Sequence, residues 1–146
     1  MVNTKGELVG INTAIASKTG SFVGYSFAIP VNIVRKVVAD LVEFGEVQRA
    51  YLGLDMVDID AQIAKKLEID DIEGVYVARV WEKGAGDKAG IEAGDIIIGV
   101  NSDLINSNAE LLEHLSQFRP GEEINIMIKR GKIPKKVKVK LQNKYG

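Results

Sequence analysis

The chain has 146 residues and a formal net charge of −1, and 46% of its residues are hydrophobic and 27% charged. This balance is typical of a globular protein and indicates neither a nucleic-acid partner nor membrane insertion. The absence of cysteine and the single histidine argue against disulfides and a transition-metal site, and no residue pattern predicts a cofactor. No apolar run approaches the length of a membrane span, and no secretory signal sequence is visible.

The first part of the chain predicts two strands followed by a helix. We expect a β-hairpin within residues 7–29, because apolar and β-branched residues flank a polar loop at 17–21. Pro30 stops the second strand. A helix over 31–44 follows, because apolar side chains recur there at helical spacing, and Gly45 is placed to end it.

A short polar connection at 46–50 is the best candidate for a domain boundary. We therefore expect two domains, 1–48 and 49–146. The second domain alternates strands and helices. Strands are expected at 54–57, 75–80, 95–101, 123–129 and 135–141, and helices at 61–67, 87–89 and 108–118.

Two of these helices carry start signals. Ser107 precedes the longest one, with Glu110 three residues later, as in a capping box. Asp87 is expected to cap the single helical turn at 87–89. The small residues at 84–86 are interpreted as a flexible loop.

The most informative motif is Tyr51-Leu52-Gly53-Leu54. In a short loop of this kind, consecutive backbone N–H groups can converge on a carboxylate, and glycine lets the backbone turn tightly. The strand that follows can accept an additional strand from a peptide. The four residues alone are also common at ordinary strand starts, so the interpretation depends on the motifs that follow.

The expected peptide groove lies between this strand and the helix at 108–118. Two strand residues and three helix residues are expected to form it, namely Asp55, Met56, Asn108, Leu112 and Leu115. The pocket for an apolar last side chain is expected to be lined by Leu52, Leu54, Met56 and Leu115. Leu111 is expected to point into the core, and Leu112 and Leu115 fit a core role equally well.

Further motifs follow in a fixed order. They are Gly-Val-Tyr-Val at 74–77, Lys-Ala-Gly-Ile at 88–91, Gly-Asp-Ile-Ile at 94–97, Val-Asn at 100–101, Pro-Gly at 120–121 and Arg-Gly at 130–131. In this order and spacing, residues 51–141 resemble a PDZ domain of the HtrA (Deg/Do-like) serine protease family. Residues 3–53 resemble the last strands and the C-terminal helix of the trypsin-like protease domain in the same family.

The resemblance implies a mostly β fold with helices. Residues 49–146 would form a PDZ domain, a small, partly open β-barrel or sandwich with two helices. Residues 1–48 would be the C-terminal remnant of a trypsin-like β-barrel. Within this remnant, the resemblance assigns Asn12, Thr13, Ala14 and Ile15 to the wall of the protease's substrate site, and 16–23 to a regulatory loop.

The resemblance also implies that catalysis needs residues outside this sequence. The family's nucleophile lies in a Gly-x-Ser-Gly-Gly motif upstream of the position of Met1, and its catalytic histidine and aspartate lie farther upstream. We therefore expect a fragment that holds no catalytic residue and is inactive alone. The family implies a bacterial periplasmic or envelope location, and a PDZ domain that binds C-terminal or exposed hydrophobic segments of unfolded proteins and regulates or supplies the protease.

Other interpretations remain open. Some PDZ domains dock onto their own chain, and the unit could serve docking or oligomerisation without binding peptide. The partners would then be the missing protease half or a second copy pairing through the strands of 1–29. His114 is interpreted as a solvent-facing helix residue, and the lysines at 135–140 as a solvated strand face. The carboxylates at 55–73 match no calcium loop, so we expect no metal site.

Overall fold

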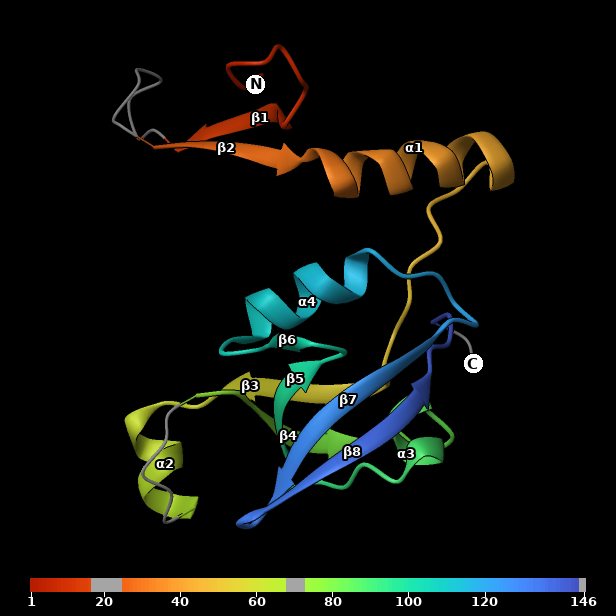
Figure 1. Cartoon of the computed structure of the whole chain (residues 1–146). Coiled ribbons are helices and arrows are strands. Elements are labelled where there is room, and N and C mark those ends of the chain that lie inside the picture. The colour runs from red at the N-terminus through yellow and green to blue at the C-terminus, as the bar shows by residue number, and fades with distance from the viewer. Residues whose placement is uncertain (17–24, 68–72, 145–146) are drawn as a thin grey trace. The chain divides into compact units, whose positions relative to one another are not determined.

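The computed structural model describes residues 1–16, 25–67 and 73–144. They form two compact units, Met1–Gln48 and Arg49–Gly146 (Figure 1). The expected loop at 17–21 and the start of the second expected strand lie outside the described residues, as does much of the loop at 16–23. No helix in the described ranges is long and apolar enough to cross a lipid bilayer.

Unit 1 is a two-stranded antiparallel sheet followed by a helix. Its elements are β1 (Gly10–Ala16), β2 (Tyr25–Pro30) and α1 (Val31–Phe44). The first strand begins later than expected, because the side-chain oxygen of Asn3 accepts hydrogen bonds from the N–H groups of Lys5 and Glu7 and holds a turn. α1 ends as expected at Gly45, whose N–H donates to the carbonyl of Leu41.

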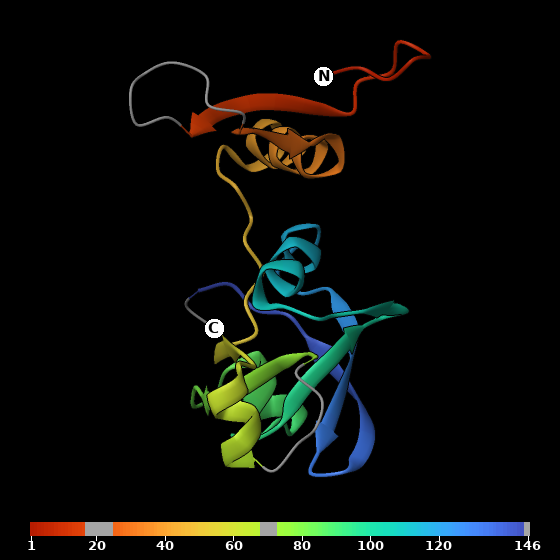
Figure 2. The same ribbon diagram turned by 90° about the vertical axis from the view of Figure 1, so that its left-hand side faces the viewer.

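Unit 2 is built on one antiparallel sheet, with strand order β3-β4-β5-β7-β8 and the short β6 paired to β5. The strands are β3 (Leu54–Asp58), β4 (Val75–Val80), β5 (Ile96–Val100), β6 (Asp103–Leu104), β7 (Glu123–Arg130) and β8 (Ile133–Lys140). Figure 2 shows β7 and β8 as one long hairpin. Among the described residues β3 pairs with β4 alone, so β3 forms an edge of the sheet.

Three helices accompany this sheet in the described part of unit 2. They are α2 (Ala61–Leu67), α3 (Ala85–Ala89) and α4 (Asn108–Ser116). α4 ends two residues earlier than expected, at Ser116 instead of Phe118, with Gln117 as its C-cap. The N–H of Gln117 donates to the carbonyl of His114, three residues back, which tightens the last turn.

The start of α3 corrects two sequence-based interpretations. Gly84 is the N-cap, so Asp87 lies inside the helix, where its carboxylate accepts a hydrogen bond from the N–H of Lys83. The stretch 84–86 is not a flexible loop, because Gly86 is a buried helix residue. A Cβ at Gly86 would lie 2.6 Å from Cδ2 of Leu54, so close packing requires glycine there.

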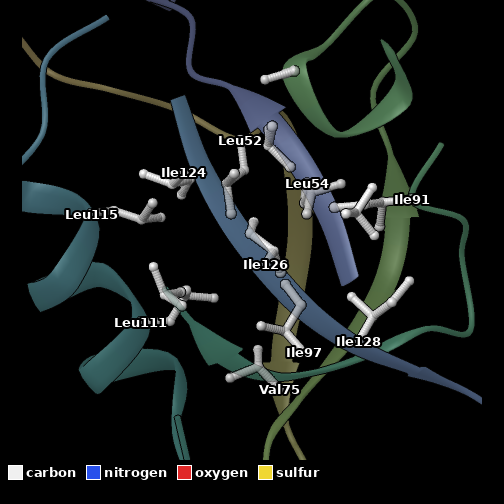
Figure 3. Packing of buried hydrophobic residues seen from close by; sticks show 14 of the residues in the cluster. Leu52, Leu54, Val75, Ile91, Ile97, Leu111, Leu115, Ile124, Ile126 and Ile128 are labelled. Atoms are coloured by element: carbon white, nitrogen blue, oxygen red, sulfur yellow. The ribbon is translucent and has the colours of Figure 1, made fainter. Parts of the chain in front are cut away.

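The hydrophobic core lies between the sheet and α4 (Figure 3). Leu111 and Leu115 point from α4 toward the β7 residues Ile124 and Ile126, and all four are buried. The expectation that Leu111 faces the core is therefore confirmed. The expected fold class, mostly β with few helices, is also confirmed, with an antiparallel sheet that does not close on itself.

Candidate functional site

The loop before β3 is anchored through its carbonyl groups. The carbonyl of Leu52 accepts a hydrogen bond from the N–H of Gly86 at 2.7 Å, and the carbonyl of Gly53 accepts one from the N–H of Trp81 at 2.9 Å. Within the described part of the chain, no hydrogen bond uses the N–H groups of Leu52 and Gly53. Two adjacent amides of this kind can bind an anion.

Gly53 gives this loop its shape. Its φ of 69° lies in the left-handed region that residues with a side chain rarely adopt. A Cβ at Gly53 would also lie 3.0 Å from the Cα of Gly84, so two chain segments approach closely here. The sequence-based expectation of a tight turn at this glycine thus has a conformational and a packing reason.

The ladder between β3 and β4 determines which backbone groups face the open edge. Leu54 lies opposite Val80, and the neighbouring bond from Trp81 to Gly53 identifies this as a non-hydrogen-bonded pair. The N–H and C=O of Leu54 therefore point away from β4. Two residues further along, Met56 lies opposite Val77.

Val77 uses both of its backbone groups on the other side, toward β5. Its N–H donates to the carbonyl of Asp95, and its carbonyl accepts from the N–H of Gly94, each at 2.9 Å. Met56 is therefore not bonded to Val77, and its backbone groups also face the open edge. Leu54 and Met56 together offer the alternate donors and acceptors that an added antiparallel strand needs.

Helix α4 lies against β3 and is tied to it at one end. The N–H of Asn108, the first residue of α4, donates to Oδ1 of Asp58, the last residue of β3, at 2.5 Å. Ser107 caps the helix as expected, accepting a hydrogen bond from the N–H of Glu110 at 3.2 Å. The carboxylate of Glu110 reaches back to the N–H of Asn106 at 2.8 Å, one residue beyond the cap.

A model of the PDZ domain matches residues 50–141. The chain belongs to the PDZ domain family. It is also 39% identical over 141 residues to the periplasmic pH-dependent serine endoprotease DegQ of Escherichia coli K12, a match that covers 97% of this chain and 31% of DegQ. The chain thus spans less than a third of the length of this curated relative.

Two solved structures resemble the chain. One is the HtrA-type protease AlgW with a decapeptide, with a TM-score of 0.72 and 29% identity over 95% of this chain and 43% of that chain. The other is the HtrA3 PDZ domain bound to the phage-derived ligand FGRWV, with a TM-score of 0.57 and 22% identity over 65% of this chain and 86% of that chain. The second likeness shows the fold alone. DegQ and AlgW confirm the resemblance to HtrA-type proteases.

The PDZ domain places the expected groove residues in two environments. Leu52, Leu54 and Leu115 are buried in the core, whereas Leu112 is 53% exposed. Met56 is partly buried and packs against the core. The expected groove residues thus range from buried in the core to exposed at the surface. Tyr51, the first residue of the expected loop, pairs with Gln142, because its N–H donates to the carbonyl of Gln142.

Asn108 carries a polar atom without a partner. Its side-chain oxygen is buried and accepts no hydrogen bond in the described part of the molecule. A buried acceptor without a donor is unfavourable by about 1–3 kcal/mol. A ligand that supplies a donor at this point would remove that penalty.

Asp55 occupies the opposite face of β3 from Leu54. Its Oδ1 accepts a hydrogen bond from the indole Nε1 of Trp81, and its Oδ2 accepts one from Nε of Arg79, both at 2.7 Å. Asp55 was expected in the groove, whereas no role was predicted for Arg79 or Trp81. Arg79 and Trp81 are two residues apart, which in a strand places their side chains on the same face. This spacing is the sequence signal that could have predicted their proximity.

The remaining candidates lie elsewhere. Asn12 and Thr13 are exposed residues of β1, and Ala14 and Ile15 continue the same strand. Nδ1 of His114 lies 3.7 Å from a carboxylate oxygen of Asp103. In the ranges that the structure describes, no three histidine, aspartate or glutamate side chains gather as metal ligands.

Proposed function

We propose that the PDZ domain binds C-terminal or exposed hydrophobic peptide segments by adding them as a strand to β3. The carboxylate of the peptide binds the N–H groups of Leu52, Gly53 and Leu54. The peptide backbone then pairs with Leu54 and Met56. The observation that carries this proposal is the unused pair of loop amides beside an edge strand whose backbone groups face outward.

The last side chain of the peptide enters between β3 and α4. Leu52, Leu54 and Leu115 form the floor of this pocket, and Met56 and Leu112 form its sides. Burying one apolar side chain contributes about 1.5–3 kcal/mol before ordering costs are subtracted. We therefore expect peptides that end in a medium or large apolar residue to bind with dissociation constants of the order of micromolar.

The relatives support a regulatory setting for this binding. AlgW was solved with a decapeptide, and DegQ is described as a periplasmic serine endoprotease. By this likeness, unit 1 is the end of a trypsin-like domain, with 12–15 at its substrate wall. The peptide-bound PDZ domain would regulate a serine endopeptidase of the bacterial periplasm or supply it with substrate.

Titration of the full chain with C-terminal peptides, followed by amide chemical shifts, tests the proposal. The largest shifts are expected at 52–56 and at the side of α4 near Leu112. The same peptide with an amidated C-terminus should bind more weakly, because the anion is lost. Equal binding of both peptides, or shifts centred elsewhere, would contradict carboxylate capture at this loop.

A second candidate function is docking or self-association through unit 1. The exposed apolar side chains of this unit include Val2, Leu8, Val38, Leu41, Val42 and Phe44. Exposed apolar surface of this extent is typical of an interface. Light scattering would compare the full chain with a shorter chain that begins at Arg49. Association of the full chain alone supports this function, and equal monodispersity argues against it.

A further inference from the structure

The β7–β8 hairpin carries lysines on the side that faces away from the core. The inward side chains of its two strands are buried, namely Ile124, Ile126, Ile128, Val137 and Val139. Side chains alternate along a strand, so the residues between these project on the opposite side. We call that side the basic face, and its lysines are Lys129, Lys136, Lys138 and Lys140.

The basic face carries little opposite charge of its own. Within the described hairpin its one carboxylate is that of Glu123, which binds Lys138 at 2.5 Å. Lys136 and Lys140 are exposed on either side of Lys138. Alternate residues of a strand are about 7 Å apart, and like charges at this spacing repel one another. An anionic partner that lies across the face would relieve this repulsion.

Helix α3 lies against β8 and extends the basic face at one end (Figure 1). The two elements border a hollow of about 410 Å³, and three lysines line it, Lys88, Lys138 and Lys140. Ala85 and Leu141 also line this hollow, and both are buried. A cavity with cations at its rim and apolar side chains at its base suits a phosphate group that is attached to an apolar body.

The turn at the other end of β8 presents an apolar side chain to solvent. Ile133, the first residue of β8, is 72% exposed and directly follows Lys132. An exposed apolar side chain among lysines is typical of proteins that contact a lipid surface, because the apolar group enters the headgroup boundary while the cations bind phosphates. An acidic protein segment would match the lysines but would leave Ile133 without a role.

We propose that the basic face and the turn at Ile133 bind the surface of an anionic phospholipid bilayer. The lysines contact headgroup phosphates, one of which occupies the hollow beside α3, and Ile133 enters the boundary between headgroups and acyl chains. Such a contact needs no membrane-spanning helix. The proposal does not rest on peptide binding, because no residue of the basic face belongs to the expected peptide groove.

Cosedimentation of the full chain with lipid vesicles tests the proposal. The vesicles consist of phosphatidylcholine alone or of an equal mixture of phosphatidylcholine and phosphatidylglycerol. The chain should bind the anionic vesicles and not the neutral ones, and binding should weaken as salt is added, because salt screens the lysines from the phosphates.

Replacing two exposed lysines of the basic face tests its role. Each lysine near an anionic surface contributes about a fivefold gain in binding, so Lys136→Gln combined with Lys140→Gln should weaken vesicle binding about 25-fold. The matched control is Lys5→Gln combined with Lys65→Gln, which removes the same charge from exposed positions outside the face. This control should bind within about twofold of the native chain, because screening limits the reach of distant charges.

Two further variants separate a lipid surface from a soluble acidic partner. Glu123→Gln should strengthen vesicle binding by about two- to fivefold, because it removes the carboxylate that neutralises Lys138. Ile133→Ser should weaken vesicle binding by about fivefold, because a polar side chain gains nothing from the acyl boundary. Leu104→Ser is the control for Ile133, since Leu104 is exposed to a similar extent, 74%, and lies on β6.

The outcomes decide the proposal. Binding to anionic vesicles alone that falls in the Lys136/Lys140 variant and in Ile133→Ser, but not in the two controls, supports a lipid-binding face. Equal binding to neutral vesicles, or equal losses in the lysine variant and its control, overturns it. Binding of polyglutamate or inorganic phosphate without vesicle binding also overturns it and assigns the lysines to a soluble anion.

Discussion

Oδ1 of Asp58 accepts a hydrogen bond from the N–H of Asn108 at 2.5 Å. This bond joins the last residue of β3 to the first residue of α4, which lies 50 positions later in the sequence. The carboxylate satisfies one of the helix's free N–H groups and lies near the positive end of the helix dipole. The strand and the helix that border the proposed groove are thus joined by one side chain. The spacing between them depends on this bond at that end.

Replacing Asp58 with alanine should therefore affect both stability and binding. The loss of a carboxylate that caps a helix lowers the free energy of unfolding by about 1 kcal/mol. Peptide affinity should fall as well, because the start of α4 is no longer held against β3. Urea unfolding and peptide titration measure the two effects.

Asp60→Ala is the matched control for this prediction. Oδ1 of Asp60 accepts the N–H groups of Gln62 and Ile63 at 2.9 and 2.8 Å and caps α2. Its loss should lower stability by a similar amount, about 1 kcal/mol, without changing peptide affinity. Equal losses of affinity in the two variants would show that stability, and not the bond to α4, explains the effect.

Gly53→Ala should weaken peptide binding strongly. The substitution places a Cβ 3.0 Å from the Cα of Gly84 and strains a backbone with a φ of 69°. We expect a loss of about 1–3 kcal/mol in stability and a distorted amide pair. Gly131→Ala is the control, because its φ of 60° is also left-handed but no atom lies within 4 Å of the added Cβ. Gly131→Ala should reduce stability alone, so a loss of binding in both variants would count against a specific role of the loop.

The sequence predicts best where local signals and tertiary structure agree. α1 and α2 show helical spacing of apolar residues, and their bounds match the expected ranges. β6 was missed because Asp103–Leu104 is too short to show a period and forms only through its pairing with β5. The prediction of a flexible loop at 84–86 was wrong, because the sequence alone does not show that Gly86 packs against Leu54.

The candidate site was predictable only where it depends on residues that are close together in the sequence. The motif at 51–54 indicates a loop and an edge strand from local chemistry. The contacts of Asp58 with Asn108 and of Asp55 with Trp81 join residues 50 and 26 positions apart, and no local pattern encodes them. The inward orientation of Leu115 likewise follows only from where α4 packs on β7.

Asp40→Asn should release the end of unit 1 from α1. Asp40 is buried, forms an ion pair with Lys36 at 2.7 Å, and accepts the N–H of Gln48 at 3.0 Å. Lys36 also donates to the carbonyl of Gln48. Removing one charge of a buried pair is unfavourable by about 3 kcal/mol.

The Gln48 amide reports this change directly. Its hydrogen exchange should accelerate in Asp40→Asn, because the acceptor of its N–H is weakened. Glu46→Gln, a change of an exposed neighbouring carboxylate, should leave the exchange rate unaltered. Unchanged protection of Gln48 in Asp40→Asn would indicate that Asp40 does not hold this connection.

Asp95 should give the PDZ domain a stability that declines in acid. The side chain is 1% exposed, and Arg130 binds both of its oxygens, with Nε at 2.8 Å and Nη2 at 2.9 Å. Burial raises the pKa of Asp95. Hydrogen bonds from Arg130 and from the N–H of Glu92, with the charges of Arg130 and Lys135, outweigh burial, and the pKa lies below its ordinary value.

The sign of the pH dependence follows from this lowered pKa. The unfolded chain binds a proton at the ordinary value of about 3.9, before the folded chain does, so the stabilisation is complete above that pH and is lost as pH falls through the folded pKa. Asp95→Asn should be less stable than the native chain by about 2 kcal/mol at neutral pH, because hydrogen bonds to a charged group are lost. The difference should shrink in acid, as measured by urea unfolding followed through the fluorescence of Trp81.

Glu123→Gln is the control for this last prediction. Glu123 binds Lys138 at 2.5 Å, and its pKa is also lowered, by the hydrogen bond and charge of Lys138. This pair is exposed to solvent, which screens it and reduces its contribution to stability. Glu123→Gln should therefore unfold like the native chain at neutral pH. A difference between the native chain and Asp95→Asn that stays constant from neutral pH into acid would show that packing, and not the charge of Asp95, stabilises this part of the domain.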